Sequence, residues 1–516
     1  MFVAGQKEMQ AMDRYTMEHI GLPGTVLMEN AGARIVEEIV ASTPHPNPRI
    51  MILVGGGNNG GDGLVIARRL FDLGLKPIVC LLVDPTRMKG DAKVHWNVYK
   101  NRGFPIFNVY KEDLDKLRDK ISQVDIIVDA ILGTGVRGPV REPLAKIIEI
   151  VNQSANKKTI ISVDIPSGVS SDDGSVEGGA IQATETISFV FPKKGFFLQD
   201  GPQYIGKWKT VDISVPPSIV ANLGLNMPRL LTESLIQASL PKRPGGGHKG
   251  TFGHVLVLGG SRSYVGAPLF AAKAAFCTGA GLVTLAVPEN IYPLIAGQNP
   301  EYLYLPLSEK AGHLADQAID LLSTRVAQFN TIALGPGIGR FLHGEMWMES
   351  LFSILTGQSV VIDADALYLM RNQLDLLHTY EGDIILTPHP GEMATMLKSS
   401  IQDVEKNRLE IAENFAKEHR IYLVLKGHRS IIATPDGRTF INPHGHDALS
   451  KGGSGDVLTG MIASFLAQGA SVEEAIITAT YLHAKAGEQQ AESLSRYGVT
   501  PLDLIEGIRR QLNEVM

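Results

Sequence analysis

A chain of 516 residues is too long to fold around one ordinary hydrophobic core, so its length predicts two domains of roughly 200–280 residues. The composition, 44% hydrophobic and 20% charged, is typical of a folded globular protein and argues against a disordered chain. A formal net charge of −6 argues against a nucleic-acid partner, because proteins that bind nucleic acid normally have a basic surface.

The sequence contains no stretch that we interpret as a signal peptide or a membrane span. Its first residues mix charged and apolar side chains without an uninterrupted hydrophobic run. The most apolar long window, Gly266–Pro288, carries Lys273 in its middle, and we expect a buried helix and strand there. The two cysteines, Cys80 and Cys277, suggest no disulfide framework. We therefore expect a cytoplasmic protein with no membrane partner.

The first half of the chain predicts a unit of strand, helix and strand. After a helix over Leu27–Val40, a short buried strand over Ile50–Val54 runs into the glycine-rich segment Gly55–Gly63. A second amphipathic helix to about Leu73 and a strand over Pro77–Val83 follow, which is the order of a βαβ unit. The glycines also satisfy the GxGxxG dinucleotide pattern, which is a weak signal by itself.

Polar side chains gather where the strands of this half end. The glycine-rich segment contains Asn58, Asn59 and Asp62, although glycine alone would suffice for a turn. A strand at 125–130 leads into a Gly-Thr-Gly sequence, and a strand at 159–163 leads into Asp164. Ligands bind at the carboxyl ends of strands in open parallel sheets, so we expect the three segments to converge. Each aspartate taken alone is equally well explained as a turn or cap residue.

Four motifs of this half together resemble the NAD(P)H-hydrate epimerase family, the YjeF N-terminal domain: LMENAG at 27–32, GNNGGDG at 57–63, DAILGTG at 129–135 and DIPSG at 164–168. The resemblance covers about residues 1–215. It implies a Rossmann-like three-layer sandwich that interconverts the R and S epimers of hydrated NADH and NADPH.

The same resemblance implies a set of site residues. The substrate would be held by Asn58, Asn59, Gly60, Gly61, Asp62, Gly133, Thr134, Gly135, Val136, Arg137, Gly138, Pro139 and Asp164. A potassium ion would be bound through oxygen atoms of Asn59, Asp129 and Ser167. We favour Asp164 as the catalytic acid/base group. Lys193 is a weaker candidate, which we interpret instead as a solvated lysine of a turn.

A segment rich in proline and glycine joins the two halves. Pro216 and Pro217 follow the last strand-like stretch, and another proline- and glycine-rich run ends at Gly247, so we place the domain boundary within 216–244. We predict domains at 1–220 and 230–516. The segment Gly245–Thr251 lacks the GK[ST] sequence of a P-loop, which excludes that motif.

Strands alternate with helices again in the second half, which predicts another α/β domain with a parallel sheet. We expect strands over His254–Leu258, Leu282–Val287, Thr331–Leu334, Ser359–Ile362, Asp383–Leu386 and Ile421–Leu425. A Pro-Asp-Gly sequence at 435–437 lies between Ser430–Thr434 and Arg438–Ile441, and it predicts a hairpin at an antiparallel edge of the sheet.

A stretch near the C-terminus, LSKGGSGDVLTGMIASFLAQG at 449–469, predicts an anion site. Three glycines precede Asp456 and a helix with one apolar face, which ends at Gly469. A glycine-rich turn before a helix directs backbone N–H groups at a phosphate. Asp456 would repel that phosphate, so we favour a proton-transfer role for it. An ordinary turn before a helix is the simpler alternative.

With HKGTFGHVLVLGGS, GPGIG, DADAL, TPHPGE and LKG, this stretch resembles the NAD(P)H-hydrate dehydratase family of the ribokinase-like superfamily, over about residues 235–512. The resemblance implies that ADP, or ATP in eukaryotic members, phosphorylates the C6 hydroxyl of the S hydrate. Elimination of phosphate then restores the dihydronicotinamide. Mg²⁺ would accompany the nucleotide, held through water and either Glu392 or Asp363.

This resemblance implies site residues as well. The nucleotide would be held by Lys426, Gly427, His428, Arg429, Ser430, Ser450, Lys451, Gly452, Gly453, Ser454 and Gly455. The hydrate would contact Ala267, Gly337, His389 and Asp456, and Asp456 would take the proton of the hydroxyl as catalytic base. A histidine between two prolines could instead simply fix a loop, and Asp363 and Asp365 could be caps at a strand end.

We therefore predict an α/β enzyme of two domains that repairs hydrated NADH and NADPH. The first domain would be an epimerase, an isomerase with K⁺, and the second an ADP-dependent dehydratase, a lyase that yields NAD(P)H, AMP and phosphate. We expect small-molecule partners only, and a homo-oligomer. The alternative is a ribokinase-like kinase of a small alcohol, of the hydroxymethylpyrimidine or thiazole type, with a dinucleotide-binding regulatory module in its first half.

Overall fold

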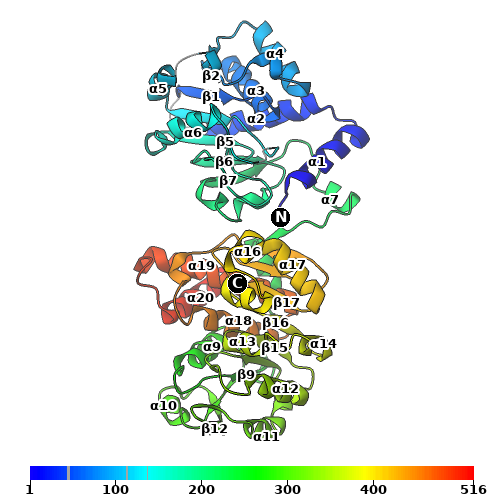
Figure 1. Ribbon diagram of the computed structural model, residues 1–516, viewed down its shortest axis with the longest axis vertical. Helices are drawn as coiled ribbons and strands as arrows, with labels where there is room; N and C mark the ends of the chain where they lie inside the picture. Colours follow the sequence, from blue (N-terminus) through cyan, green and yellow to red (C-terminus); the bar gives the residue numbers. More distant parts are fainter. Residues whose placement is uncertain (43–46, 112–113, 136–137) are drawn as a thin grey trace. The chain divides into compact units, whose positions relative to one another are not determined.

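The computed structural model describes residues 1–42, 47–111, 114–135 and 138–516, and these form two compact units, Met1–Met227 and Pro228–Met516 (Figure 1). Each unit has helices around a predominantly parallel sheet, so the predicted α/β fold class is confirmed. In the part of the chain that the structure describes, no helix is long and apolar enough to cross a membrane.

The first unit is built on a seven-stranded parallel sheet in the order β3-β2-β1-β4-β5-β6-β7. Its strands are β1 (Ile50–Val54), β2 (Ile78–Leu81), β3 (Phe107–Asn108), β4 (Ile126–Ala130), β5 (Thr159–Val163), β6 (Glu185–Phe189) and β7 (Lys207–Val211). The two edge strands have no clear signal in the sequence, because β3 is two residues long and β7 is a half-exposed strand that carries two lysines.

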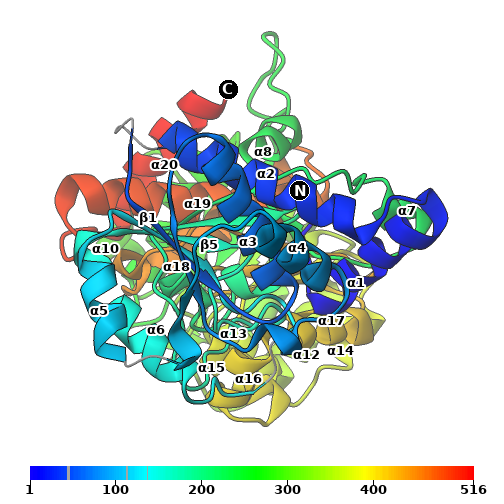
Figure 2. The same cartoon turned by 90° about the horizontal axis from the view of Figure 1, so that it is seen from above.

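Strand β1 contributes alternate side chains to two separate cores. Ile50, Ile52 and Val54 pack in the core that includes helices α1 (Gln6–Tyr15), α2 (Gly24–Ser42), α3 (Asn58–Asp72), α4 (Gly90–Asn101) and α7 (Ile219–Asn222). Met51 and Leu53 pack in the core with α5 (Leu114–Ser122) and α6 (Leu144–Asn152). Successive side chains of a strand point to opposite faces, so the sheet lies between two helical layers, as Figure 2 shows.

The second unit has a ten-stranded sheet in the order β11-β10-β9-β14-β15-β16-β17-β18-β19-β8. It is parallel from β11 to β17 and antiparallel over β17-β18-β19. The strands are β8 (Arg229–Leu230), β9 (His254–Leu258), β10 (Leu282–Pro288), β11 (Leu303–Leu307), β14 (Thr331–Leu334), β15 (Ser359–Ile362), β16 (Ile384–Leu386), β17 (Tyr422–Leu425), β18 (Ile431–Ala433) and β19 (Thr439–Ile441), and a separate pair joins β12 (Glu309–Lys310) to β13 (His313–Leu314).

Helix α18 (Ser454–Ala467) lies in the middle of the second core. It packs with α9 (Gly266–Cys277) and α19 (Val472–Leu494) and against the sheet, so every residue from Val457 to Ala467 is buried. The expectation of one apolar face was therefore wrong, because partners surround the helix. The remaining helices are α8 (Glu233–Ser239), α10 (Tyr292–Ala296), α11 (Ala318–Ser323), α12 (Gly344–Ile354), α13 (Asp365–Met370), α14 (Leu376–Thr379), α15 (Pro390–Leu397), α16 (Ile401–Lys406), α17 (Arg408–His419) and α20 (Pro501–Val515).

Two local expectations need correction. The glycine-rich segment after β1 is shorter than expected, because α3 already begins at Asn58 with Gly57 as its N-cap. The hairpin of β18 and β19 is antiparallel as predicted, but it is not the edge of the sheet. The short strand β8, just after the boundary between the units, pairs with β19 and covers it. A two-residue strand gives no periodic signal in a sequence.

Candidate active sites

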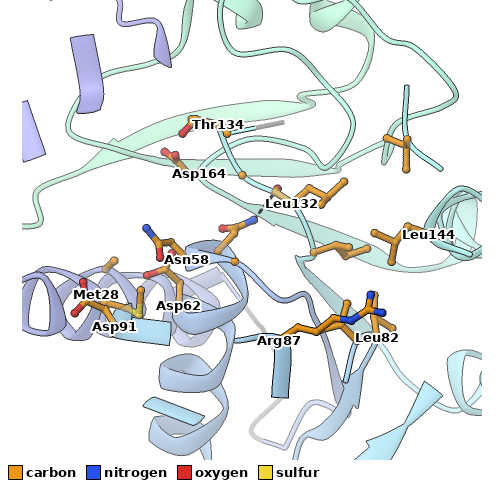
Figure 3. Close-up of a pocket in the computed structure, with 18 of the residues that line it drawn as sticks. Met28, Asn58, Asp62, Leu82, Arg87, Asp91, Leu132, Thr134, Leu144 and Asp164 are labelled. Atoms are coloured by element: carbon orange, nitrogen blue, oxygen red, sulfur yellow. Dashed lines mark hydrogen bonds between the residues drawn. The ribbon is translucent and has the colours of Figure 1, made fainter. Parts of the chain in front are cut away.

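A cavity of about 1120 Å³ lies at the carboxyl ends of the strands of the first sheet. The segments after β1, β4 and β5 converge on it, as the sequence predicted, and the end of β2 joins them (Figure 3). The predicted substrate-binding residues on its wall are Asn58, Asn59, Asp62, Gly133, Thr134, Gly135, Gly138, Pro139 and Asp164. The cavity is large enough for a substantial part of a dinucleotide.

Two of the predicted residues lie behind this wall. A Cβ atom on Gly60 would come within 2.0 Å of the carbonyl oxygen of Gly55, and one on Gly61 would come within 2.5 Å of the sulfur of Met28. These glycines therefore let α3 pack closely against its neighbours. Val136 and Arg137 lie outside the described residues.

Of the three predicted potassium ligands, Asn59 lies on the wall of the cavity, whereas Asp129 and Ser167 are fully buried behind it. Asn59 and Ser167 are connected through the carbonyl oxygen of Leu132, which accepts from the side chains of both. The buried carboxylate of Asp129 accepts hydrogen bonds from Ser162 Oγ (2.8 Å) and from both the amide N–H (2.8 Å) and Oγ (2.5 Å) of Ser167. Burial raises the pKa of Asp129, and these hydrogen bonds oppose the shift. Asn59 Nδ2 donates to the carbonyl oxygen of Leu132 (2.8 Å), whereas its buried Oδ1 has no hydrogen-bond partner among the described residues.

The carboxylate of Asp164 forms an ion pair with a buried lysine, Lys193. Its Oδ1 accepts from Lys193 Nζ (2.6 Å), from the amide of Phe189 (3.0 Å) and from Ser188 Oγ (3.2 Å). Lys193 is 0% exposed and also donates to the carbonyl oxygens of Phe189 (3.2 Å) and Phe191 (3.0 Å). Our interpretation of Lys193 as a solvated turn lysine was therefore wrong. Its surroundings include two segments that are remote in sequence, those of Ala4 and Asp164, and a local pattern does not reveal them.

Two further carboxyl groups on the cavity wall have raised pKa values. Burial, followed by the negative charge of Asp164, raises the pKa of Asp13 to about 6. The pKa of Asp62 is raised well above its usual value by burial first and then by the charges of Asp164 and Asp13. Asp13 was missed at the sequence level, because an aspartate on an amphipathic surface helix gives no signal of its own.

In the second unit, Asp456 lies in the first turn of α18 close to a buried ion pair. Lys426 Nζ donates to Asp363 Oδ1 (2.7 Å) and lies 3.9 Å from Glu392 Oε2, while Thr459 Oγ1 donates to Asp363 Oδ2 (2.7 Å). Burial, followed by the charge of Asp363, raises the pKa of Asp456 to about 7. A carboxyl group that titrates near neutrality is suited to proton transfer.

Asp363 is thus more than a cap at the end of β15. It is 1% exposed, and the ammonium group of Lys426 lowers its pKa against the opposing effect of burial. Lys426 follows β17, so the ion pair joins the carboxyl ends of two strands of the sheet. A Cβ on Gly455 would lie 3.2 Å from Lys426 Nζ, which places the pair directly at the beginning of α18.

The turn before α18 requires glycine at its N-cap. Gly453 has φ +98°, in the left-handed region, and a Cβ there would come within 2.8 Å of side-chain carbons of Pro501 and Phe270. His483 of α19 contacts the carbonyl oxygen of Ser454 at 2.8 Å, and burial lowers the pKa of this histidine to about 4. A neutral imidazole therefore fixes the turn at neutral pH. The first backbone N–H groups of α18 have no carbonyl partner within the helix, which is the arrangement that favours a bound anion.

The residues predicted to contact the hydrate lie in two places on this unit. Gly337 and Ala267 are neighbours, because a Cβ on Gly337 would be 3.1 Å from the Cβ of Ala267. His389 caps α15: its Nδ1 accepts from the amides of Gly391 (3.0 Å) and Glu392 (3.2 Å), and Glu392 Oε2 accepts from the amide of His389 (2.8 Å). The loop-fixing role is thus real, and the side chain of His389 remains 56% exposed.

The predicted nucleotide-binding segments differ in exposure. Ser450, Lys451 and Gly452 are exposed or nearly so, and Lys451 Nζ donates to the carbonyl oxygen of Tyr497 (2.5 Å). In the segment 426–430, Arg429 Nε donates to the carbonyl oxygen of Pro443 (3.1 Å), and burial lowers its pKa to about 10. Of the other residues in these segments, His428 is exposed, Ser430 is half-buried and Ser454 is buried.

A buried arginine that was not predicted from the sequence, Arg408, packs against the segment 426–430. Arg408 is 8% exposed, and its Nη2 donates to the carbonyl oxygen of Leu425 (3.2 Å). A Cβ on Gly427 would come within 2.2 Å of the same nitrogen, so the guanidinium lies against the backbone of Gly427. Its nearest carboxylate is Glu405 at 3.8 Å, and burial lowers the pKa of Arg408.

The donor sets fit the two expected cations differently. Among the described residues, no group of three or more His, Cys, Asp or Glu side chains is arranged to hold a metal ion. The orphaned Oδ1 of Asn59 beside the Asp129 carboxylate suits a monovalent cation held by oxygen atoms. In the second unit both oxygens of Asp363 accept hydrogen bonds, which leaves Glu392 as the carboxylate better able to reach Mg²⁺. Mg²⁺ commonly uses one or two carboxylates together with the phosphates of its nucleotide.

Comparisons with known families match one family to each unit. Residues 24–195 match the family described as YjeF-related protein N-terminus, and residues 255–510 match the family described as NAD(P)H-hydrate dehydratase.

Proteins similar over the whole chain carry a single description. A bifunctional NAD(P)H-hydrate repair enzyme of Moorella thermoacetica is 38% identical over 98% of this chain and 96% of its own length. One of the same description from Thermofilum pendens is 33% identical over 99% of this chain and 96% of its own length. The second unit is similar to the crystal structure of ADP/ATP-dependent NAD(P)H-hydrate dehydratase from Bacillus subtilis with ATP/Mg²⁺, with 31% identity, TM-score 0.50, and coverage of 56% of this chain and 99% of that one.

Proposed function

The chain belongs to the family of bifunctional NAD(P)H-hydrate repair enzymes, and we propose that its two units perform the two successive reactions of that repair. The first unit exchanges the R and S epimers of hydrated NADH and NADPH. The second unit uses ADP or ATP to remove water from the S epimer and returns NADH or NADPH. The observation that carries this proposal is one well-placed carboxyl group in each unit: Asp164 on the wall of the first cavity, and Asp456 at the start of α18, whose pKa is raised to about 7.

In the first unit, the cavity binds the hydrate and its acidic corner acts on C6. Asp164 exchanges a proton with the hydroxyl group on C6, and Lys193 holds the carboxylate of Asp164 in place through the 2.6 Å ion pair. Asn58 and the glycines at 133 and 135 approach the substrate with amide groups. Asn59 Oδ1, Asp129 and Ser167 would hold K⁺, whose positive charge would offset that of the Asp129 carboxylate in a buried place.

In the second unit, Asp456 takes the proton from the C6 hydroxyl as the oxygen attacks the terminal phosphorus of the nucleotide. The backbone amides of residues 453–455 and the ammonium group of Lys426 stabilise the negative charge on the transferred phosphoryl group. Asp363 orients Lys426 toward the helix. Mg²⁺, carried with the nucleotide and reached by Glu392, would neutralise phosphate charge. The phosphate then leaves C6, C5 loses a proton, and the double bond re-forms.

One assay with three proteins tests both reactions. A mixture of R and S hydrates is incubated with ADP or with ATP, and recovery of the absorbance of the reduced nicotinamide is followed together with phosphate release. Wild-type protein is expected to convert the whole mixture. Asp456→Asn is expected to lose nucleotide-dependent recovery by about 10²–10⁴-fold while it still exchanges the epimers.

The converse variant, Asp164→Asn, is expected to stop at the S fraction of the mixture and to dehydrate pure S hydrate at the normal rate. Equal loss of both activities in each variant would contradict the assignment of one reaction to each unit. A stable phosphorylated product without recovery of absorbance would instead support a small-alcohol kinase. The better nucleotide in the wild-type assay identifies the phosphoryl donor.

A further inference from the structure

The N-terminal helix α1 is tied to the segment that carries Lys193. Residues Ala4 and Lys193 form a β-bridge, in which Lys194 N donates to the carbonyl oxygen of Ala4 (2.8 Å). Lys194 Nζ is also paired with Glu8 (2.6 Å), and the amide of Gln6 donates to Asp172 (2.7 Å). These contacts fix α1 beside the buried ion pair of Lys193 and Asp164. Asp13, about two helical turns after Gln6 on the same helix, reaches the wall of the cavity.

Part of the cavity wall is acidic, because Asp13, Asp62 and Asp164 lie on it and interact electrostatically. Figure 3 shows the side chains of Asp62, Asp91 and Asp164 on the cavity, together with Arg87. Asp62 is 7% exposed, and the charges of Asp164 and Asp13 add to the effect of burial on its carboxyl group. An ionised carboxyl group in such a place costs free energy unless a positively charged ligand compensates for it. The acidic part therefore suits a group that carries or develops positive charge.

The environment of Asp13 favours the protonated form of its carboxyl group more than the environment of a surface aspartate would. Burial and the charge of Asp164 raise its pKa to about 6, while the ammonium group of Lys193 opposes that shift. The groups that face Asp13 are thus Asp164, Lys193 and Asp62, each from a different segment of the unit. An acid and a base on one cavity are what an epimerisation through proton transfer requires.

From this arrangement we infer that Asp13 is the proton donor that opposes Asp164 in the proposed epimerase reaction. The inference rests on the function proposed above, in which the substrate is a cyclic hemiaminal with a hydroxyl group on the carbon next to the ring nitrogen. Asp13 gives its proton to this hydroxyl, the carbon–oxygen bond breaks, and water leaves as the ring nitrogen supplies its electron pair to form an iminium ion.

Water then adds to the opposite face of the carbon, and its proton passes to the carboxylate of Asp164. The sum is an inverted centre with no net consumption of water, and proton transfer from Asp164 back to Asp13 resets the site. Asp62, which interacts electrostatically with both carboxyl groups, lowers the energy of the iminium ion through its position on the same wall. In the reverse direction the donor and acceptor exchange roles.

The test compares Asp13→Asn with wild type in the full-length chain. Pure R hydrate is incubated without nucleotide, and appearance of the S epimer is followed by chromatography at several pH values, with the spontaneous rate subtracted. Asp13→Asn is expected to lower the maximal rate by about 10²–10⁴-fold with little change in KM. The fall in wild-type rate as pH rises through about 6 is expected to disappear in the variant.

Two controls separate catalysis from folding. Dehydration of pure S hydrate by the second unit reports an intact chain, and Asp115→Asn removes a carboxylate that is 86% exposed on α5. Asp13→Asn is expected to dehydrate pure S hydrate at the wild-type rate, and Asp115→Asn is expected to exchange the epimers at the wild-type rate. An Asp13→Asn rate within about threefold of wild type, or a retained pH dependence, overturns the inference. If Asp13→Asn fails to fold, Asp13→Glu decides: restored exchange with a shifted pH profile supports the donor, and normal exchange with an unchanged profile refutes it. Absence of exchange by wild type would instead refute the proposed function.

Discussion

Replacement of Asp456 by asparagine should stabilise the second unit at high pH, because the native carboxylate is held in a place that disfavours its charge. Asp456 is partly buried, and burial together with the charges of Asp363 and Glu392 raises its pKa from 3.8 to about 7. In the unfolded chain the same group ionises with the ordinary value. Since the folded pKa is the higher one, the protonated group contributes stability below about pH 4, and this contribution is lost as pH rises through about 7.

The size of the effect follows from the shift. One pKa unit corresponds to about 1.4 kcal/mol, so a shift of about three units destabilises the ionised folded form by roughly 4 kcal/mol. About 1.5 kcal/mol of this is already lost at about pH 5, and roughly 3 kcal/mol is lost between about pH 5 and pH 8.5. For a unit of this size, that corresponds to a change in Tm of roughly 5 °C.

The assay is calorimetric unfolding of wild type, Asp456→Asn and the control Asp320→Asn, which alters an exposed side chain of α11. The difference in Tm between Asp456→Asn and wild type should grow by roughly 5 °C from about pH 5 to pH 8.5. The control difference should remain constant. A constant difference for Asp456→Asn as well would show that Asp456 titrates normally, and the argument for its role as base would fail. Stability gained with activity lost is the pattern typical of a catalytic group.

Two further predictions concern one residue in each unit, Asn59 and Arg408. Asn59→Leu removes the unpartnered Oδ1 near Asp129, so epimer exchange by the variant should become insensitive to replacement of K⁺ by a large organic cation. The exchange rate of wild type should fall at least about tenfold on the same replacement. Equal sensitivity of the two proteins would contradict K⁺ binding at this place. Arg408→Met removes the guanidinium that lies against Gly427, so KM for the nucleotide should rise by about tenfold while KM for the S hydrate stays unchanged. Arg510→Met, which alters a 64% exposed side chain, is the matched control. An equal effect of the two variants would refute a role of Arg408 in the nucleotide segment.

The local elements of this protein could be predicted from its sequence. Strands such as Thr159–Val163 and His254–Leu258 are short apolar runs between turn residues, and their bounds in the structure are those expected. The polar residues at the strand ends could be predicted to converge, because parallel strands bring their carboxyl ends to one edge. The glycines before Asp456 indicated a turn and a helix start for the same local reason.

Burial and long-range pairing were decided only by the tertiary structure. Lys193 is a solvated turn lysine by local pattern, but the carbonyl oxygens of Phe189 and Phe191 and the carboxylate of Asp164 surround it. Asp363 and Lys426 are 63 positions apart and meet only because their strands share a sheet edge. Asp13 reaches the cavity because Ala4 pairs with the Lys193 segment. A side chain's pKa depends on the charges and solvent around it, and these come from segments that are distant in sequence.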